Sequence, residues 1–159
     1  VLSKNGDTTG AVFEPNATAE QFDLFVRYQT SRHGDGSMAK MDFEDYQSMV
    51  EDSSAKTLVI EYRTLDDTLV ACALSDTLNN SLSMVYSFFD PMAGRRSLGT
   101  FMILDHIRRA TALKFDFVYL GYWIAEAPKM AYKANFRPLE TLGQSGWERL
   151  ELPSPTDWP

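Results

Sequence analysis

Residues 82–122 constrain the fold most strongly, because the spacing of their apolar residues changes twice. Leu82–Phe89 alternates with the two-residue period of a β-strand. Ser97–Lys114 then places its apolar residues at helical spacing, at Leu98, Phe101, Leu104, Ile107 and Ala110. Phe117–Tyr122 is strand-like again. Two strands joined through a helix normally pair in parallel by a right-handed crossover, so we expect these two strands to be parallel neighbours.

Helical patterns precede the first strand. Residues 1–17 contain glycine, proline, threonine and asparagine, and we expect them to form a loose arm. Thr18 and Gln21 fit a capping box that opens a helix to about Ser31. A second, short helix is expected to begin near Asp42. The residues that it should bury are Phe43, Tyr46 and Val50.

Two further strands are expected at Thr57–Arg63 and Thr68–Ser75, which are rich in β-branched and aliphatic residues. Short turns join them to each other and to Leu82–Phe89, which predicts an antiparallel meander. The predicted fold is therefore of the α/β (α+β mixed) class, with an antiparallel meander joined to a parallel strand–helix–strand unit. We expect one folded domain over residues 18–150 and a proline-rich tail over 151–159.

Length and composition bound the class of protein. The chain has 159 residues, and 44% of them are hydrophobic, which is enough for one compact domain with a core. It contains no apolar run of the ~18–20 residues that a membrane span needs. A single cysteine, Cys72, excludes a disulfide within the chain and favours a cytoplasmic location. Because the first residue is Val1, we expect a piece of a longer protein.

Charge is distributed unevenly along the sequence. The net charge of −7 argues against a protein that coats nucleic acid indiscriminately. Residues 95–137, however, hold eight Lys and Arg against three Asp and Glu. An acidic protein with one basic region can steer an anionic partner to one place, although ordinary surface charge is the alternative.

The turn Arg95–Thr100 joins two arginines to a helix start. Exposed N–H groups and the helix dipole favour a phosphate or carboxylate there, so we predict an anion site made by Arg95, Arg96, Ser97, Leu98, Gly99 and Thr100. The turn resembles the Arg/Gln-x-x-Gly-x-Gly/Ala sequence of coenzyme-A-dependent GNAT acyltransferases. Phe101 stands where Gly or Ala is expected, and its ring should crowd a pyrophosphate. A helix start with two solvated arginines is the alternative.

The next strand ends in Tyr119-Leu120-Gly121-Tyr122-Trp123. Ligands commonly bind at the carboxyl ends of parallel strands, and Gly121 allows a close approach to the backbone. Tyr119 and Tyr122 are therefore candidate site residues, although core packing explains either of them singly.

Residues 127–137 carry lysines at helical spacing. If this segment is helical, Ala127, Met130, Ala131 and Ala134 face inward. The outer residues Lys129, Tyr132 and Lys133, with Arg137 shortly after, are then candidates to hold a phosphate or an acidic peptide. Ordinary solvated lysines are an equal alternative.

Asp76 follows the apolar run Leu69–Leu74, where a carboxylate can bind an ammonium group or accept a proton. A turn-capping aspartate is the alternative. Arg32 and His33 lie in a glycine-rich loop, in which His33 could be a base or a tRNA contact. His106 receives no role, and the spacing of the cysteine and the two histidines fits no metal site.

Together these residues resemble the catalytic half of the arginyl-tRNA–protein transferase family, most closely its bacterial branch of aspartate/glutamate leucyltransferases. The resemblance covers residues 17 to 150, and its motifs are Arg32-His33, Ala73–Asp76, Val85–Pro91, Arg95–Thr100, Tyr119–Trp123 and Lys129–Pro138. It implies a GNAT-like fold that takes its acyl group from aminoacyl-tRNA. The family's N-terminal Cys-x-x-Cys region is missing, so we expect a fragment without metal, cluster or other cofactor.

The implied reaction transfers leucine, or arginine, from its tRNA to a protein that begins with Asp or Glu and so marks that protein for the N-degron pathway. The resemblance suggests that Arg95, Arg96 and the Ser97–Thr100 amides hold the terminal tRNA phosphate. Lys129, Lys133 or Arg137 would pair with the acceptor's acidic side chain. Asp76 would bind an ammonium group or act as base, while Tyr119 and Tyr122 would orient the ester. A coenzyme-A-dependent N-acetyltransferase and a non-catalytic module that binds acidic N-termini remain as alternatives.

Overall fold

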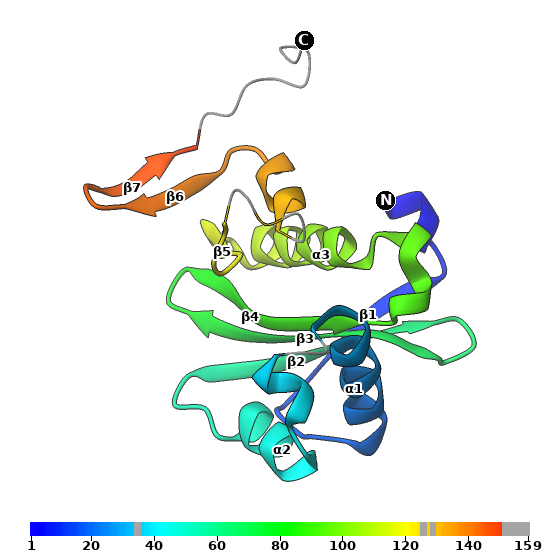
Figure 1. Ribbon diagram of the computed structural model, residues 1–159. Coiled ribbons are helices and arrows are strands. Elements are labelled where there is room, and N and C mark those ends of the chain that lie inside the picture. Colours follow the sequence, from blue (N-terminus) through cyan, green and yellow to red (C-terminus); the bar gives the residue numbers. More distant parts are fainter. Residues whose placement is uncertain (34–35, 125–126, 128–129, 151–159) are drawn as a thin grey trace. The chain divides into compact units, whose positions relative to one another are not determined.

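The computed structural model describes residues 1–33, 36–124, 127 and 130–150 (Figure 1). The chain divides into two compact units, Val1–Gly121 and Tyr122–Pro159. The first unit holds a five-stranded sheet of order β1-β2-β3-β4-β5. All neighbouring strands are antiparallel except β4 and β5. The strands are β1 (Thr8–Phe13), β2 (Lys56–Thr64), β3 (Leu69–Leu78), β4 (Ser81–Phe89) and β5 (Phe117–Tyr119).

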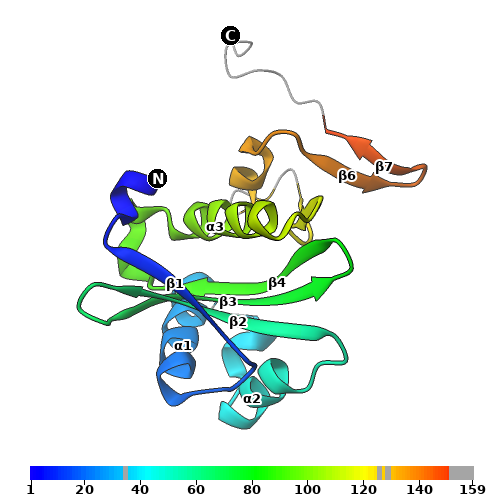
Figure 2. The same cartoon turned by 180° about the vertical axis from the view of Figure 1, so that it is seen from behind.

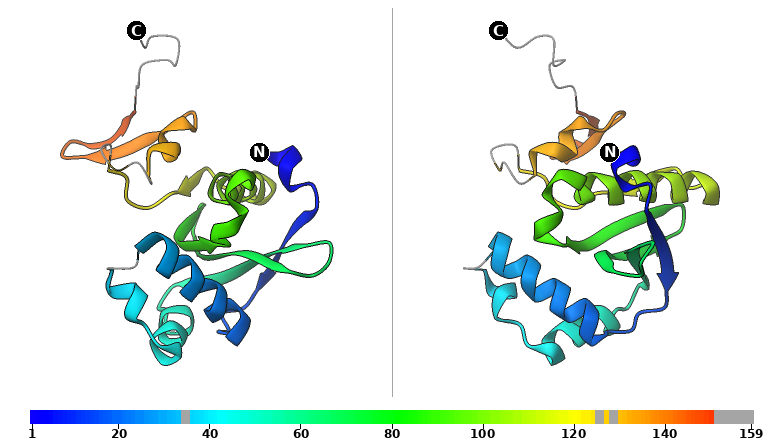
Figure 3. Two further views of the ribbon diagram at one scale, coloured as in Figure 1. Left: turned by 45° about the vertical axis from the view of Figure 1, so that its right-hand side comes forward. Right: turned by 90° about the vertical axis from the view of Figure 1, so that its right-hand side faces the viewer.

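Helices cover both faces of this sheet. α1 (Ala19–His33) and α2 (Phe43–Glu51) lie on one face, and α3 (Leu98–Leu113) lies on the other (Figures 1 and 2). The turned views in Figure 3 show the strands between α1 and α3. Central strand β3 is consequently buried from Leu69 through Ser75. The α/β (α+β mixed) class and the meander joined to a parallel strand–helix–strand unit are thereby confirmed.

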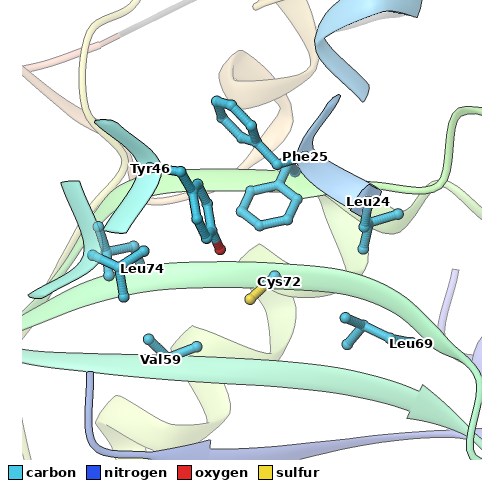
Figure 4. Packing of buried hydrophobic residues seen from close by; sticks show 9 residues of the cluster. Leu24, Phe25, Tyr46, Val59, Leu69, Cys72 and Leu74 are labelled. Atoms are coloured by element: carbon cyan, nitrogen blue, oxygen red, sulfur yellow. The ribbon is translucent and has the colours of Figure 1, made fainter. Parts of the chain in front are cut away.

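Aromatic and aliphatic side chains pack between the sheet and the first two helices (Figure 4). The rings of Phe25 in α1 and Tyr46 in α2 lie 5.1 Å apart, between their centroids. Cys72, the one cysteine of the sequence, is 2% exposed beneath them. Burial raises the pKa of its thiol, and the negative charge of Glu61 raises it further.

The predicted helices begin where their caps indicated. Thr18 and Gln21 exchange the two hydrogen bonds of a capping box at the start of α1, each 3.2 Å long. Asp42 caps α2 in the same way with Asp45. Tyr46 and Val50 are buried as expected, whereas Phe43 is 37% exposed. The structure also contains short 3₁₀ helices that the sequence did not indicate. These are η1 (Leu2–Asn5) before β1, η2 (Ser37–Lys40) between α1 and α2, and η3 (Pro91–Arg96) between β4 and α3.

The prediction of a loose arm over residues 1–17 is wrong for η1 and β1. All six residues of β1 pair with β2. Gly10, which suggested a loop, instead allows close packing, because a Cβ atom there would lie 2.8 Å from both Tyr62 Cε1 and an Arg109 terminal nitrogen. A side chain at this position would collide with groups beneath the strand, so glycine is a packing requirement here.

Asp105 in α3 is only 7% exposed and links this helix to the sheet by hydrogen bonds. Its Oδ2 accepts hydrogen bonds from the Tyr62 hydroxyl at 3.0 Å and from Arg109 Nε at 2.6 Å. Its Oδ1 accepts from Arg108 at 2.7 Å, and Arg109 also donates to the Gly10 carbonyl at 2.7 Å. Burial acts to raise the pKa of Asp105, but the hydrogen bonds from Arg108 and Arg109 and the charge of Arg109 hold it below its ordinary value.

The second unit contains η4 (Ala131–Asn135) and a hairpin of β6 (Glu140–Gly143) and β7 (Gly146–Arg149). The sequence analysis predicted a longer helix and no strands here. The predicted domain over 18–150 therefore spans parts of both units, and the predicted tail, 151–159, lies outside the described residues. Among the described helices, none combines the length and apolarity needed to cross a membrane.

Replacing Asp105 by alanine leaves the Tyr62 hydroxyl and Arg109 Nε without their acceptor. We expect the free energy of unfolding to fall by roughly 2–4 kcal/mol in urea denaturation. Arg108→Ala is the matched control, because its side chain is 74% exposed and its loss should cost less than about 1 kcal/mol. Equal losses in the two variants would contradict this account of Asp105.

Candidate functional site

The parallel strands β4 and β5 pair over only three residues each. Ser81, Leu82 and Ser83 lie opposite Phe117, Val118 and Tyr119. β4 then continues to Phe89, and in the described part of the chain no strand pairs with it on this side. Among the described residues, the backbone groups on this side of β4 beyond Ser83 therefore have no partner strand. β5 was predicted to reach Tyr122, but Gly121 has left the strand with a φ of +73°.

A β-bulge shapes the same part of β4. The pairing with β3 shifts between Leu74–Tyr86 and Ser75–Met84, which leaves Val85 without an opposite residue. Val85 is 51% exposed. The simple alternation predicted for Leu82–Phe89 therefore fails at this residue, and the backbone of β4 bends beside its unpaired edge.

A row of polar side chains crosses four strands at one end of the sheet. Thr57, Asp76, Ser83 and Tyr119 are successive cross-strand partners and so share the face that α1 and α2 cover. Thr57 donates its hydroxyl hydrogen to Asp76 Oδ1 at 2.7 Å. Asp76 is thus a half-buried strand residue with a cross-strand partner. It lies about 10 Å from Tyr119, two strand spacings away.

The predicted anion turn lies after the other end of β4. Ser97 has left-handed backbone angles (φ 55°, ψ 48°) and makes no side-chain cap for α3. The first-turn amides of Leu98, Gly99 and Thr100 therefore lack the usual side-chain acceptor. η3, immediately before, lines an open depression of about 480 Å³ with residues 91–96. Phe101 is 9% exposed and packs on Tyr62. Its ring therefore lies in the core, whereas the sequence analysis expected it to crowd a pyrophosphate at the turn.

The two arginines of the turn differ in their contacts. Arg95 is exposed and has no hydrogen-bond or ion-pair partner among the described residues. Arg96 donates from Nε to Asn5 Oδ1 at 3.0 Å, and from a terminal nitrogen to Thr8 Oγ1 at 2.5 Å and to Asp7. Its guanidinium is thus bound to the N-terminal segment, which the sequence analysis did not anticipate.

The predicted site residues of the first unit form two groups. Six residue steps along β4 separate Ser83 from Phe89, a distance of about 20 Å. Asp76 and Tyr119 therefore lie near the start of β4, whereas Arg95–Thr100 follows the end of this strand. The sequence analysis assigned Arg95–Thr100 to the terminal tRNA phosphate, Asp76 to an ammonium group or the proton, and Tyr119 to the ester. These assignments stay predictions.

Between the two groups lies a polar pair that carried no sequence-based assignment. Gln29 Nε2 in α1 donates to the Tyr86 hydroxyl in β4 at 2.5 Å, while Gln29 Oε1 is buried without a partner. Burial raises the pKa of Tyr86 to about 12, against the opposing effect of the Gln29 hydrogen bond. Arg32, predicted as a site residue, places its guanidinium 5.4 Å from the Phe89 ring centre, near the end of β4. In the sequence, Tyr86 could have been singled out by its position within the motif Val85–Pro91.

His33 is the last residue of α1, but its side chain and the neighbouring residues 34–35 lie outside the described part of the chain. The role of His33 as a base or tRNA contact therefore stays a prediction.

In the second unit, two of the predicted acceptor-binding residues donate hydrogen bonds to backbone carbonyls of the same unit. Lys133 Nζ donates to the Tyr122 carbonyl at 3.0 Å, and burial lowers the pKa of this lysine. Arg137 donates to the carbonyls of Ala134 and Phe136. Tyr122 is 91% exposed and Tyr132 is half-buried. Lys129 lies outside the described residues.

The predicted packing of the 127–137 segment is only partly reproduced. Ala134 is buried and Met130 half-buried, but Ala131 is exposed, because a 3₁₀ turn replaces the expected α-helix.

A serine–histidine pair outside these groups is structural. Ser75 Oγ lies 2.7 Å from His106 Nε2, and His106 Nδ1 lies 2.7 Å from the Met102 carbonyl. Since a carbonyl only accepts, Nδ1 carries the proton and Nε2 accepts from Ser75. Both side chains are buried, so no substrate reaches them. The described residues also contain no group of three or more His, Cys, Asp or Glu that could hold a metal ion.

Solved structures place this architecture among the acetyltransferases. The ribosomal-protein-S18-alanine N-acetyltransferase of Escherichia coli superposes with a TM-score of 0.59 at 11% identity, covering 94% of this chain and 99% of that chain. A GNAT-family acetyltransferase of Staphylococcus aureus gives a TM-score of 0.57 at 14% identity, covering 95% and 90%. At these identities the likeness concerns the fold, which is that of the GNAT acyltransferases.

Sequence relatives define the family. Residues 20–143 match the family described as arginine-tRNA-protein transferase, C terminus. The aspartate/glutamate leucyltransferase of Paramagnetospirillum magneticum is 52% identical over 146 residues, covering 92% of this chain and 60% of that protein. The enzyme of the same name in Phenylobacterium zucineum is 50% identical over 152 residues, covering 92% and 59%. The chain belongs to the arginyl-tRNA–protein transferase family and spans about 60% of the length of these relatives.

Stability should depend on pH through His106. Burial lowers the pKa of His106 in the folded chain, whereas the unfolded value is about 6.5. The folded state therefore binds fewer protons in this range, so the contribution to stability is complete above about pH 6.5 and is lost as the pH falls towards the folded-state pKa.

Between about pH 7 and 5, we expect the free energy of unfolding to fall less steeply in His106→Gln than in the wild type. The difference in slope should be up to about 1.4 kcal/mol per pH unit, measured from denaturation curves recorded at each pH. His33→Gln is the control, since His33 is the only other histidine. An unchanged slope in His106→Gln would refute this assignment.

Proposed function

We propose that this chain carries the transferase site of an aminoacyl-tRNA–protein transferase. The proposed reaction moves leucine from leucyl-tRNA to the N-terminal α-amine of proteins that begin with Asp or Glu, in the N-degron pathway of the cytoplasm. The observation that carries the proposal is the 50–52% identity, over 92% of the chain, to proteins named aspartate/glutamate leucyltransferase. The acyltransferase fold supports it.

In the proposed reaction, a neutral α-amine attacks the carbonyl carbon of the aminoacyl ester. An amide bond forms, the ester C–O bond breaks, and the proton lost by the amine ends on the departing ribose hydroxyl. Holding the two substrates together can supply up to ~7–11 kcal/mol of the barrier. The remaining requirements are a proton acceptor and hydrogen-bond donors for the oxyanion.

The polar row supports a role for Asp76 as the group that holds an ammonium or accepts the proton. Its hydrogen bond from Thr57 orients the carboxylate, and Tyr119 lies on the same face to orient the ester, with Tyr122 as a further candidate. Backbone N–H groups along the unpaired edge of β4 are suited to the oxyanion. In this proposal, Lys129, Tyr132, Lys133 and Arg137 of the second unit meet the acidic side chain of the acceptor.

The anion turn supports binding of the tRNA backbone by Arg95 and the amides of residues 97–100. Asp76 pairs with Ser83 near the start of β4, and the turn follows the end of that strand. We therefore assign the bound phosphate to a nucleotide that precedes the esterified one. The single-stranded acceptor end of the tRNA would then run along β4.

The direct test is a transfer assay with the full-length protein, using leucyl- and arginyl-tRNA and peptides that begin with Asp, Glu, Lys or Ala. We expect leucine transfer to the Asp and Glu peptides only. Binding of an Asp peptide without transfer would favour a non-catalytic module, and acetyl transfer from acetyl-coenzyme A would favour an ordinary N-acetyltransferase. Arginine transfer would reassign the donor.

Asp76→Asn should lower kcat/KM for leucine transfer by roughly 10²–10⁴, the usual contribution of a general base, with unchanged affinity for leucyl-tRNA. Asp23→Asn, in an exposed pair with Arg27, is the control and should transfer normally. A wild-type rate in Asp76→Asn would remove Asp76 from the site.

Arg95→Ala should weaken leucyl-tRNA binding and reduce its dependence on salt. Loss of one phosphate contact to a single strand lowers the slope of log K against log salt by about 0.7, which equilibrium binding at several salt concentrations measures. Lys114→Ala, which removes an exposed cation at the other end of α3, is the control. An unchanged slope in Arg95→Ala would contradict the proposed contact.

A further inference from the structure

Arg96 joins two segments that are far apart in the sequence. It ends η3. Of its partners, Asn5 ends η1, Thr8 begins β1, and Asp7 lies between these two elements. Asn5 completes the contact in the opposite direction, since its Nδ2 donates to the Arg96 carbonyl at 2.9 Å and to the Val1 carbonyl at 3.0 Å. We name this set of contacts the Arg96 clasp.

The clasp is well enclosed at its centre. Asn5 is 2% exposed and Thr8 is 8% exposed, while the Arg96 side chain is 23% exposed. The carboxylate of Asp7 lies at the outer side, 47% exposed. If Arg96 turned outward, the buried Asn5 Oδ1 would lose the donor that Arg96 Nε supplies, and Thr8 would lose a charged hydrogen bond. This loss disfavours an outward position of Arg96.

The residue that follows Arg96 needs such support. Ser97 is a non-glycine residue in the left-handed region, which costs roughly 1–2 kcal/mol, and its own side chain makes no cap. The clasp holds the preceding residue by both its carbonyl and its guanidinium. It therefore fixes the direction in which the chain enters α3 and the direction of the first-turn amides.

The two arginines of the turn differ in whether an acidic side chain neutralises them. Asp7 neutralises the charge of Arg96, whereas Arg95 has no such partner among the described residues. We propose that Arg96 is a positioning residue: through Asn5, Asp7 and Thr8 it fixes the anion turn for the donor, and Arg95 alone of the two meets the tRNA phosphate. The donor part rests on the proposed function, while the clasp itself does not.

Direct contact between Arg96 and phosphate is the competing explanation, and it makes the opposite prediction for Asp7. If Arg96 contacts the phosphate, removing Asp7 frees its charge and strengthens binding or leaves it unchanged. If Arg96 acts through the clasp, removing Asp7 loosens the turn and weakens binding. Asp7 and Arg96 should then give the same loss, and the double variant should lose no more than either single one.

The experiment measures the affinity of the full-length protein for leucyl-tRNA in Asp7→Ala, Arg96→Ala and the double variant, at several salt concentrations. We expect a roughly three- to tenfold loss in each of the three, an unchanged salt slope, and an unchanged KM for the acceptor peptide. Arg96→Lys should recover part of the affinity by restoring the pair with Asp7. Glu14→Ala, which removes an exposed acid after β1, is the matched control and should bind normally.

Two results would overturn the inference. One is normal or tighter binding by Asp7→Ala. The other is a fall of about 0.7 in the salt slope of Arg96→Ala, the signature of a lost phosphate contact.

Thermal unfolding of the wild type, the two alanine variants and the double variant separates the clasp from the proposed function. Non-additive destabilisation by the Asp7 and Arg96 substitutions supports the clasp, and additive effects refute it. A wild-type protein that neither binds nor uses leucyl-tRNA would refute the proposed function and the donor part of this inference, but would leave the unfolding result intact.

Discussion

The burial of β3 on both faces is the constraint on which the rest of the first unit depends. From Leu69 through Ser75 every residue of this strand is buried, with the aromatic cluster of α1 and α2 on one face and His106 of α3 on the other. A shift by one residue would exchange the two faces of this strand, moving Cys72 and Leu74 out of the aromatic cluster and Ser75 away from His106. Its neighbours β2 and β4 are thereby fixed, and with them the row that contains Asp76. The polar groups of the site thus lie in a frame that the core determines.

The short pairing between β4 and β5 sets one edge of this sheet apart from the others. Three residue pairs hold the parallel strands together, and β4 then extends beyond them with a bulge at Val85 and an unpaired edge. Asp76 and Tyr119 lie at the start of this edge, and the anion turn lies after its end. Under the proposed function, the single-stranded end of a tRNA would run along this edge from one region to the other. Gln29 and Tyr86 lie between them, on the face that α1 covers.

The sequence predicted those elements whose signals are local. Capping residues marked α1 and α2, alternation marked β2, β3 and most of β4, and the apolar repeat marked α3. β1 was missed because Gly10 suggests a loop, whereas the glycine is required by Tyr62 and Arg109, which are distant in sequence. The Arg96 clasp was missed for the same reason, since nothing near Arg96 indicates a pairing with Asp7. Phe101 was correctly placed on a helix but its ring faces the core, which only the packing of α3 on Tyr62 decides. Motif spacing thus located the candidate site residues, while tertiary contacts determine which of them are exposed to a ligand.

The position of Cys72 has a practical consequence for handling the protein. A thiol reacts as its thiolate, and this sulfur is both 2% exposed and held protonated by its apolar surroundings and by Glu61. Thiol-directed alkylating reagents should therefore leave Cys72 unmodified in the folded chain and reach it only as β3 comes apart. The rate of labelling at this one sulfur would report how often the centre of the sheet opens.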